Sequence, residues 1–255
     1  MENKEIKDFS QVPGREFSHV NKITGYMRLA MAAVLSSGRS GLNILDMPAG
    51  NGLFAENLRQ YGHTVTSGDI NSERPDFVFV NMERPLPFGD ASFDAVVCLE
   101  GIEHVISPAH LVAEICRVLK PDGFVILSLP NVQSLYSRLK FLLTGTFYLF
   151  DPEQNCHPNG LLIDRGHISP VTLVQLQYFF GEFGLQPLEI TGDKIKRKIL
   201  MPIYLFIWFI SLSLSWLKNI KNKRDDMQKL HRFLNSFSAM TGRSLVTVWG
   251  KPRKN

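Results

Sequence analysis

The sequence predicts an α/β fold built on a doubly wound, mostly parallel sheet. Three observations indicate this fold. Short apolar runs typical of buried strands alternate with helical or looped segments through the first half of the chain, two of these runs end in an aspartate, and a glycine turn follows the first. With 255 residues and 44% hydrophobic content the chain can bury one sizeable core, so we expect a single domain over residues 1–255.

The elements follow in order along the chain. Helical spacing predicts an opening helix over 17–36 and a short one over 53–60. A Lys-Pro-Asp-Gly turn at 120–123 precedes the fifth strand, and Pro130 ends it, so helical spacing resumes only from about Ser134. The predicted strands cover residues 42–46, 63–68, 76–80, 94–99, 123–129 and 244–249.

The loop after the first strand looks like a nucleotide site. Residues 43–52 read NILDMPAGNG, and Gly50 and Gly52 lack the Cβ atoms that would keep a ligand from the main chain. The first free N–H groups of the helix over 53–60 would point into this turn. Asp69 ends the second strand, where a carboxylate can accept both hydroxyls of a ribose.

Two nucleotides compete for this loop. Residues 50–55 also satisfy the dinucleotide pattern G-x-G-x-x-A, with Asp69 at about the expected distance, so an NAD(P)-dependent oxidoreductase is the alternative. Two features favour a methyl donor. Asp46 lies four positions before the first glycine, and it is followed by Pro48 and Ala49, where a dinucleotide fingerprint would normally have a glycine. Each acid also has a structural interpretation, as a helix cap or turn former, but acids at successive strand ends share the edge where such sheets bind ligands.

Four segments occur in the order found in one enzyme family. They read LDMPAGNG, SGDI, NMERPLPFGDASFDAVVCLEGIEHV and RVLKPDGFVILSLPN. On these segments the chain resembles the class I S-adenosylmethionine (SAM)-dependent methyltransferases, clearly over residues 42–131 and loosely over 166–190. The resemblance implies a Rossmann-like, seven-stranded α/β fold with SAM as the cofactor.

The resemblance also implies roles for single residues. Asp46 would steady the charged end of the donor through water or the loop backbone, and Asp69 would hold the ribose. Where the family usually has a glycine and another small residue, this chain has Pro48 and Ala49, so we expect a stiffer backbone there. The remaining donor contacts are Gly50 and Gly52 along the methionine part and Asn81 and Met82 beside the adenine; the structural alternative for Asn81 is a local turn.

An E-x-x-E-H cluster follows the fourth strand. If the chain turns helical there, one turn presents Glu100, Glu103 and His104 together. The same spacing is seen in similar metal-assisted enzymes, including ubiquinone-pathway O-methyltransferases and small-RNA 2′-O-methyltransferases; the latter add a later histidine, for which His167 is the counterpart. These residues would hold a divalent ion such as Mg²⁺ that draws an acceptor hydroxyl toward its alkoxide. The alternative is a metal-free site with His104 or His167 as general base.

An apolar segment precedes the last strand. Residues 199–217 carry no charge, and as a helix they would be about 28 Å long, near the thickness of a bilayer core. Residues 192–243, the insertion, hold eleven Lys and Arg against three Asp. Because the strand at 244–249 must return to the same sheet, we favour a helix or bent hairpin lying in the cytoplasmic leaflet over a crossing. A buried dimer helix or a substrate lid is the alternative.

The remaining composition bears on partners and location. The polar N-terminus lacks an apolar signal core, and Cys98, Cys116 and Cys156 are scattered, which predicts a cytoplasmic protein at the inner face of the membrane. The insertion carries a net charge of +8 and the remainder of the chain −4. The basic charge therefore points to an anionic membrane surface, and no nucleic acid is expected as a partner of the mildly acidic body. An aromatic patch at 141–150 indicates either an acceptor pocket or a packing helix.

These expectations combine into one hypothesis. The chain is predicted to be a SAM-dependent O-methyltransferase that acts at the cytoplasmic membrane face on a small-molecule or lipid-linked, amphipathic acceptor. A membrane-tethered SAM-binding scaffold without turnover is the non-enzymatic alternative.

Overall fold

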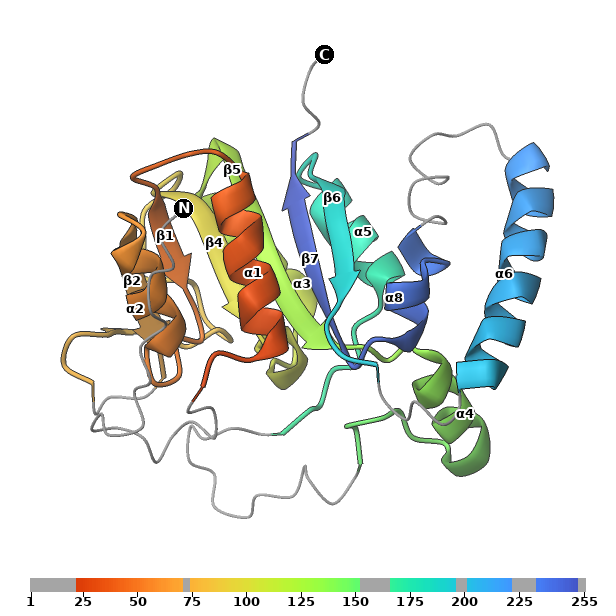
Figure 1. The fold of residues 1–255 in the computed structure, drawn as a ribbon. Coiled ribbons are helices and arrows are strands. Elements are labelled where there is room, and N and C mark those ends of the chain that lie inside the picture. The colour runs from red at the N-terminus through yellow and green to blue at the C-terminus, as the bar shows by residue number, and fades with distance from the viewer. Residues whose placement is uncertain (1–21, 71–73, 152–165, 196–200, 222–232, 252–255) are drawn as a thin grey trace.

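The computed structural model describes residues 22–70, 74–151, 166–195, 201–221 and 233–251, and they are organised around one seven-stranded sheet. The strand order is β3-β2-β1-β4-β5-β7-β6 (Figure 1). All neighbouring strands pair in parallel except at β7, which is antiparallel to both β5 and β6. The strands are β1 (Asn43–Asp46), β2 (Thr64–Asp69), β3 (Val78–Phe79), β4 (Phe93–Leu99), β5 (Leu119–Pro130), β6 (Gln186–Gly192) and β7 (Ser244–Gly250).

The sheet has its topological switch point between β1 and β4. The chain moves outward from β1 to β3 and then crosses to β4 on the other side of β1. Asp46 therefore pairs with Ser67 of β2 and with Val97 of β4 at the carboxyl ends of all three strands. Open α/β sheets bind their ligands at this place, so the predicted donor loop occupies the expected edge.

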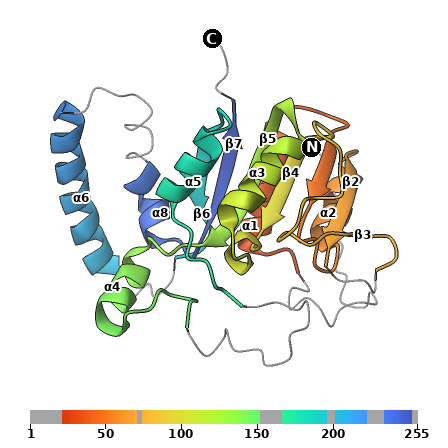
Figure 2. The same cartoon turned by 180° about the vertical axis from the view of Figure 1, so that it is seen from behind.

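Helices cover both faces of the sheet (Figures 1 and 2). One apolar core lies between the sheet and α1 and α2, and the other between the sheet and α3 and α5. A short helical turn, η2 (Ile102–His104), follows β4 directly. The helices are α1 (Gly25–Ser36), α2 (Leu53–Gln60), α3 (Pro108–Val118), α4 (Leu135–Thr144), α5 (Leu173–Gly181), α6 (Met201–Lys221) and α8 (Phe237–Thr241).

Most predicted elements are confirmed, and three differ in extent. The strand predicted over 76–80 is only the two-residue β3. The helix α1 begins at Gly25 and not within 17–24, because the Thr24 side chain caps it by accepting from the Met27 N–H; residues 17–21 lie outside the described residues. The predicted turn at 120–123 exists as an irregularity inside β5. There Leu119 pairs with Phe93 and Phe124 with Ala95, so the intervening residues bulge out of the ladder.

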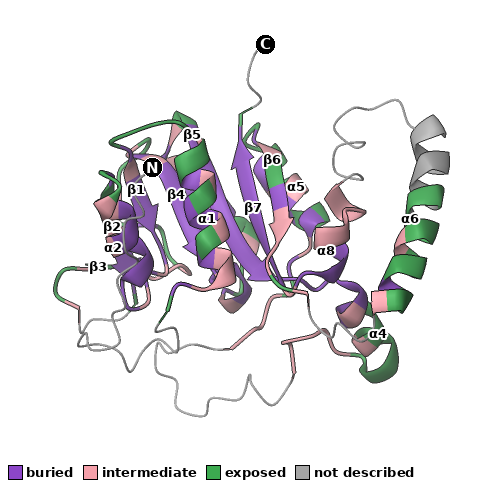
Figure 3. Cartoon of the chain, viewed as in Figure 1, coloured by how far each residue is buried: buried purple, intermediate pink, exposed green. Residues whose placement is uncertain are grey.

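Residues 201–217 of the apolar segment lie in one continuous helix, α6, so the segment is not bent into a hairpin within its described residues. Tyr204 and Trp208, one turn apart, pack against Leu135 of α4 and Met240 of α8. Much of the rest of α6 is exposed, as is the outer side of α4 (Figure 3). Within the described chain no helix combines the length and apolar character that a membrane crossing needs. Residues 196–200 and 222–232 of the insertion lie outside the described residues.

Candidate active site

The loop after β1 is shaped by glycine backbone conformations. Gly50 and Gly52 have φ angles of 55° and 81°, which L side chains rarely adopt. The Gly52 N–H donates to the Ala49 carbonyl at 2.9 Å, and the Ala49 N–H donates to Gly68 of β2 at 2.9 Å. A Cβ atom on Gly52 would also lie only 3.0 Å from the ring of Phe77. The predicted turn is therefore present and leads directly into α2.

The departure at Pro48 has a structural counterpart across the switch point. A Cβ atom on Gly101, just past β4, would lie 2.5 Å from Cδ of Pro48. The proline ring therefore fits because residue 101 has no side chain. This contact also brings the donor loop against the chain segment that leads into η2.

Asp69 and Asp46 are both buried at this edge. Asp69 accepts a hydrogen bond from the Gly50 N–H at 2.7 Å, so the predicted ribose carboxylate already contacts the donor loop. Asp46 is 1% exposed; the Ala55 N–H of α2 donates to its carboxylate, but its Oδ2 has no hydrogen-bond partner among the described residues. Burial, with the nearby Asp69 charge, raises the pKa of Asp46 to about 8.

The buried Oδ2 of Asp46, which has no hydrogen-bond partner among the described residues, bears on whether the loop suits SAM. A buried carboxylate oxygen without a partner is costly unless a ligand supplies a donor or a positive charge. SAM carries positive charge on its ammonium and sulfonium groups, so the chemistry of Asp46 fits that donor. The N-cap residue of α2 is Gly52, so the alternative that Asp46 is a helix N-cap is wrong, although Asp46 accepts one N–H of the first turn of α2.

Asn81 and Met82 lie just beyond β3. The Asn81 side chain accepts from the Glu83 N–H at 2.9 Å, which is the local turn considered as its structural alternative. Met82 is partly buried against the core. The Val80 N–H donates to the Asp69 carbonyl at 2.8 Å, which places this segment beside Asp69.

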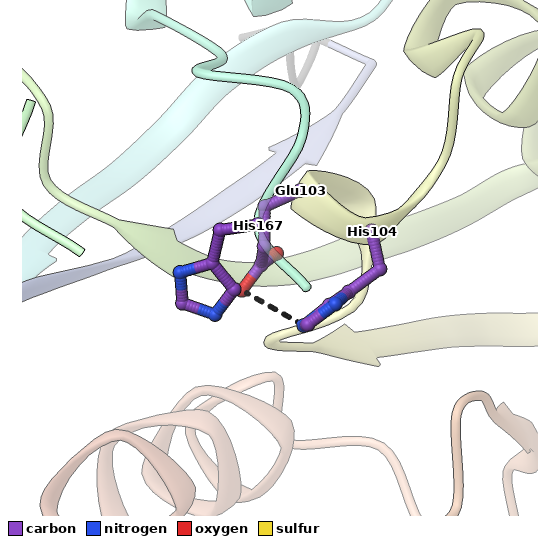
Figure 4. A group of neighbouring side chains, drawn as sticks. All are labelled: Glu103, His104 and His167. Carbon is purple, nitrogen blue, oxygen red and sulfur yellow. Dashed lines mark ion pairs between the residues drawn. The ribbon is translucent and has the colours of Figure 1, made fainter. Parts of the chain in front are cut away.

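Glu103, His104 and His167 come together beyond β4. One ligand atom from each lies within 4.8 Å of the others (Figure 4). The Glu103 side chain is 1% exposed, and its Oε1 lies 4.0 Å from Nε2 of His104. The two imidazole rings are 4.8 Å apart at 78°, an edge-to-face contact.

Backbone contacts explain how residues so far apart in sequence meet. The Ile168 and Ser169 N–H groups both donate to the Glu103 carbonyl at 3.0 Å. The Ser169 hydroxyl donates to the Val105 carbonyl at 2.6 Å. The segment after His167 is thereby fixed onto η2, and the His167 ring lies beside His104. The expectation that His167 joins this site is met in the structure.

Glu100 is not part of this group, contrary to the expected ligand set. Its backbone has a φ of 49° and η2 begins only at Ile102, so Glu100 and Glu103 do not share one helical face. The Ser128 hydroxyl donates to its carboxylate at 2.9 Å, and the Ser244 hydroxyl lies at 3.4 Å. Neither serine was predicted from the sequence, although Ser128 is the polar residue within the apolar run 124–129 and offered a signal.

The donor set decides which metal would fit. With bonds of about 2.0–2.2 Å in tetrahedral geometry, the ligand atoms of one ion lie roughly 3.3–3.6 Å apart, so these side chains, whose ligand atoms lie within 4.8 Å of one another, would have to move closer by roughly 1 Å. One carboxylate with two imidazoles suits borderline ions such as Zn²⁺, Mn²⁺ or Fe²⁺ better than the predicted Mg²⁺, which prefers oxygen ligands.

Comparison with known sequences supports the same enzyme class. A family profile described as a methyltransferase domain matches residues 21–190. The chain is 30% identical over 151 residues to the ubiquinone biosynthesis O-methyltransferase of Klebsiella pneumoniae subsp. pneumoniae, covering 51% of this chain and 62% of that protein, less than two thirds of its length. The protein of the same name from Photobacterium profundum is 29% identical over 208 residues, covering 74% of this chain and 84% of that protein.

A solved structure shows the same fold. A SAM-dependent methyltransferase from Methanosarcina mazei superposes with a TM-score of 0.52 at 18% identity, covering 87% of this chain and 98% of that one. Identity at this level supports the fold alone. Because the family profile covers more than half of its residues, the chain belongs to the class I SAM-dependent methyltransferases.

Proposed function

We propose that this enzyme transfers a methyl group from SAM to a hydroxyl oxygen of an amphipathic acceptor, either a small molecule or a lipid-linked one. The observation that carries the proposal is the meeting of His104 and His167 with Glu103, close to the donor loop. Gly101, two residues before Glu103, packs on Pro48 of that loop. The two relatives are named as ubiquinone biosynthesis O-methyltransferases, which supports oxygen as the acceptor atom.

The donor half of the site would orient the methyl group. When bound, SAM supplies an electrophilic methyl group on sulfur. Asp69 would accept the ribose hydroxyls, and Asp46 would lie near the positively charged part of the donor. The left-handed turn at Gly50 and Gly52 lets the ligand approach the main chain. Fixing the donor this way supplies part of the rate through proximity.

The acceptor half would manage one proton. A neutral imidazole of His104 or His167 accepts the hydroxyl proton, so that the acceptor oxygen attacks as an alkoxide. Glu103, His104 and His167 would also be the residues that hold a divalent ion, which would lower the pKa of the bound hydroxyl. Turnover that withstands a strong chelator would leave the histidines as bases only, whereas loss restored by Zn²⁺, Mn²⁺ or Fe²⁺ supports the ion.

An exposed apolar surface supports a membrane-bound acceptor. The α4–α6 apolar surface includes Leu142 at 79% and Phe206 at 67% exposure. On α6 the exposed apolar residues of this surface lie on every side of the helix except the side that Tyr204 and Trp208 bury. Packing against one protein helix would need only a narrower apolar stripe, so the wide apolar surface favours lipid. The surface comprises Leu139, Phe141, Leu142, Leu143, Ile203, Leu205, Phe206, Ile207, Phe209, Ile210 and Leu212.

Charge complements this surface. Between Lys194 and Arg224 the sequence contains eight Lys and Arg and no acidic residue. Basic residues at both ends of an apolar helix favour an anionic bilayer surface, with the helix lying in one leaflet. We propose that the enzyme docks there, on the cytoplasmic side, and takes its acceptor from the membrane.

The central test compares cofactors and then looks for turnover. Calorimetric titration with SAM is expected to show saturable binding, while NAD⁺ and NADP⁺ give none. Labelled SAM is then incubated with fractionated lipid and aqueous cell extracts to find a methylated product. Absence of SAM binding would refute the proposal and favour the oxidoreductase. Binding without transfer to any fraction would favour the non-catalytic scaffold.

A further inference from the structure

A second polar cluster lies at the same sheet edge, on the β5–β7 side of β4. Arg243 lies in the bend between α8 and β7. Because β7 runs antiparallel to β5, the first residue of β7 lies at the sheet edge where β5 ends (Figure 1). The Arg243 N–H donates to the Lys194 carbonyl at 2.7 Å, and its carbonyl accepts from the Asn131 N–H at 2.9 Å. The backbone of Arg243 is therefore fixed at this edge.

The Arg243 side chain is half-buried and has unused donor capacity. Its Nε is closed off from solvent and has no hydrogen-bond partner among the described residues. Two acids at this edge accept hydrogen bonds from other groups: Glu100 from Ser128 and Ser244, and Asp193 from the Ser244 N–H at 2.9 Å. A guanidinium offers five N–H donors, and leaving a buried one unsatisfied costs free energy unless a ligand accepts from it.

Arg243 lies near the chain segment that leads into η2, because the hydroxyl of the next residue, Ser244, lies 3.4 Å from the Glu100 carboxylate. Its charge lowers the pKa of Glu100, against the larger effect of burial that raises it. Burial raises the pKa of Tyr26 to about 12, with Glu100 and Glu103 adding to the rise and Arg243 opposing it. The charges of Arg243 and of Glu103 therefore both act on Tyr26.

We propose that Arg243 binds an anionic oxygen group of the acceptor, a carboxylate or a phosphate, while the hydroxyl to be methylated lies at His104 and His167. The planar guanidinium fork matches the two oxygens of either anion. Arg243 is then a specificity-determining residue that selects acidic acceptors over neutral ones. This inference rests on the proposed function for the identity of the acceptor but not for the presence of an anion site.

The test titrates protein saturated with S-adenosylhomocysteine with three probes: benzoate, its neutral isostere benzamide, and inorganic phosphate. Wild type is expected to bind benzoate or phosphate and not benzamide, and the anion that binds shows which source the site prefers. Arg243→Gln should weaken that binding about ten- to a hundredfold, and Arg243→Lys less, because the charge remains without the fork. Arg28→Gln, an exposed arginine on α1, is the matched control and should bind as wild type does.

Two results would overturn the inference: wild type that binds neither anion, or Arg243→Gln that binds as tightly as wild type. Thermal unfolding shows whether Arg243→Gln is folded. If it is not, Arg243→Lys is the deciding variant: anion affinity of Arg243→Lys equal to that of wild type would contradict binding by the guanidinium fork. Binding of S-adenosylhomocysteine is measured separately on the same samples. Loss of that binding alone refutes the proposed function and leaves the anion site standing.

Discussion

The two halves of the ligand edge are assembled in different ways. The donor half comes from one stretch of chain between Asp46 and Met82, and hydrogen bonds to the loop backbone fix it. The acceptor half is assembled from residues far apart in sequence, such as His104, His167 and Arg243. Under the proposed function, the donor half would set the affinity for SAM, whereas the acceptor half would set turnover and acceptor choice.

The largest expected effect lies in the acceptor half. His104→Ala should lower kcat about 10²- to 10⁴-fold, because a positioned base contributes that much to proton transfer. The dissociation constant for SAM should stay within about twofold, which calorimetry and a labelled-methyl assay measure together. His110→Ala, an exposed histidine on α3, is the control. Loss of SAM binding in His104→Ala would show that the two halves are not separable.

The next effect lies in the donor half and should be its mirror image. Asp69→Ala should weaken SAM binding about ten- to a hundredfold, since it removes charge-assisted hydrogen bonds to the ribose. Asp122→Ala, an exposed aspartate far from the edge, should bind SAM normally. Unchanged affinity in Asp69→Ala would mean that its contact with Gly50 is purely structural.

The same contrast explains how far the sequence could be interpreted. The donor loop was predictable because its glycines, its acids and the strand and helix that hold it are contiguous. His167 was expected only through resemblance, and the contacts that place it, from Ile168 and Ser169 to the Glu103 carbonyl, have no local signature. Glu100 was misplaced because the spacing suggested a helical turn, whereas its backbone adopts a left-handed conformation before η2 begins.

Arg243 was invisible for a related reason. In the sequence it is one more basic residue of the insertion, and only the pairing of β7 with β5 brings it to the ligand edge. The length and apolar character of α6 were predictable from composition. Which side it buries, at Tyr204 and Trp208, depends on α4 and α8 and was not.

A smaller effect tests whether the acceptor half faces a membrane. Replacing Phe206 and Phe209 together by Ser should reduce sedimentation with anionic vesicles about tenfold or more, because burying each ring in lipid is worth about 1.5–3 kcal/mol. Tyr178→Ser, which removes an exposed aromatic ring from α5, should sediment as wild type does. Unchanged sedimentation would contradict membrane docking, and a concentration-dependent dimer lost in the double variant would instead assign the surface to a second copy.

The smallest effect concerns how the donor half responds to pH. Asp46 has a usual pKa of 3.8 and one of about 8 in the fold, so between these values the folded protein holds a proton that the unfolded chain has released. The stabilisation from that proton is complete below pH 3.8 and is lost as the pH rises to about 8. Asp46→Asn cannot titrate, so its melting temperature should fall less across this window and should exceed that of ligand-free wild type at pH 8.

SAM binding by the donor half should respond to pH with the opposite sign, because the cationic donor favours ionised Asp46. Wild-type affinity should therefore rise as the pH is raised through the folded pKa of about 8, while the affinity of Asp46→Asn stays flat. If the melting temperatures of the two proteins changed with pH in the same way, Asp46 would already be ionised in the ligand-free fold. The unpaired Oδ2 of Asp46 would then not be explained by a bound proton.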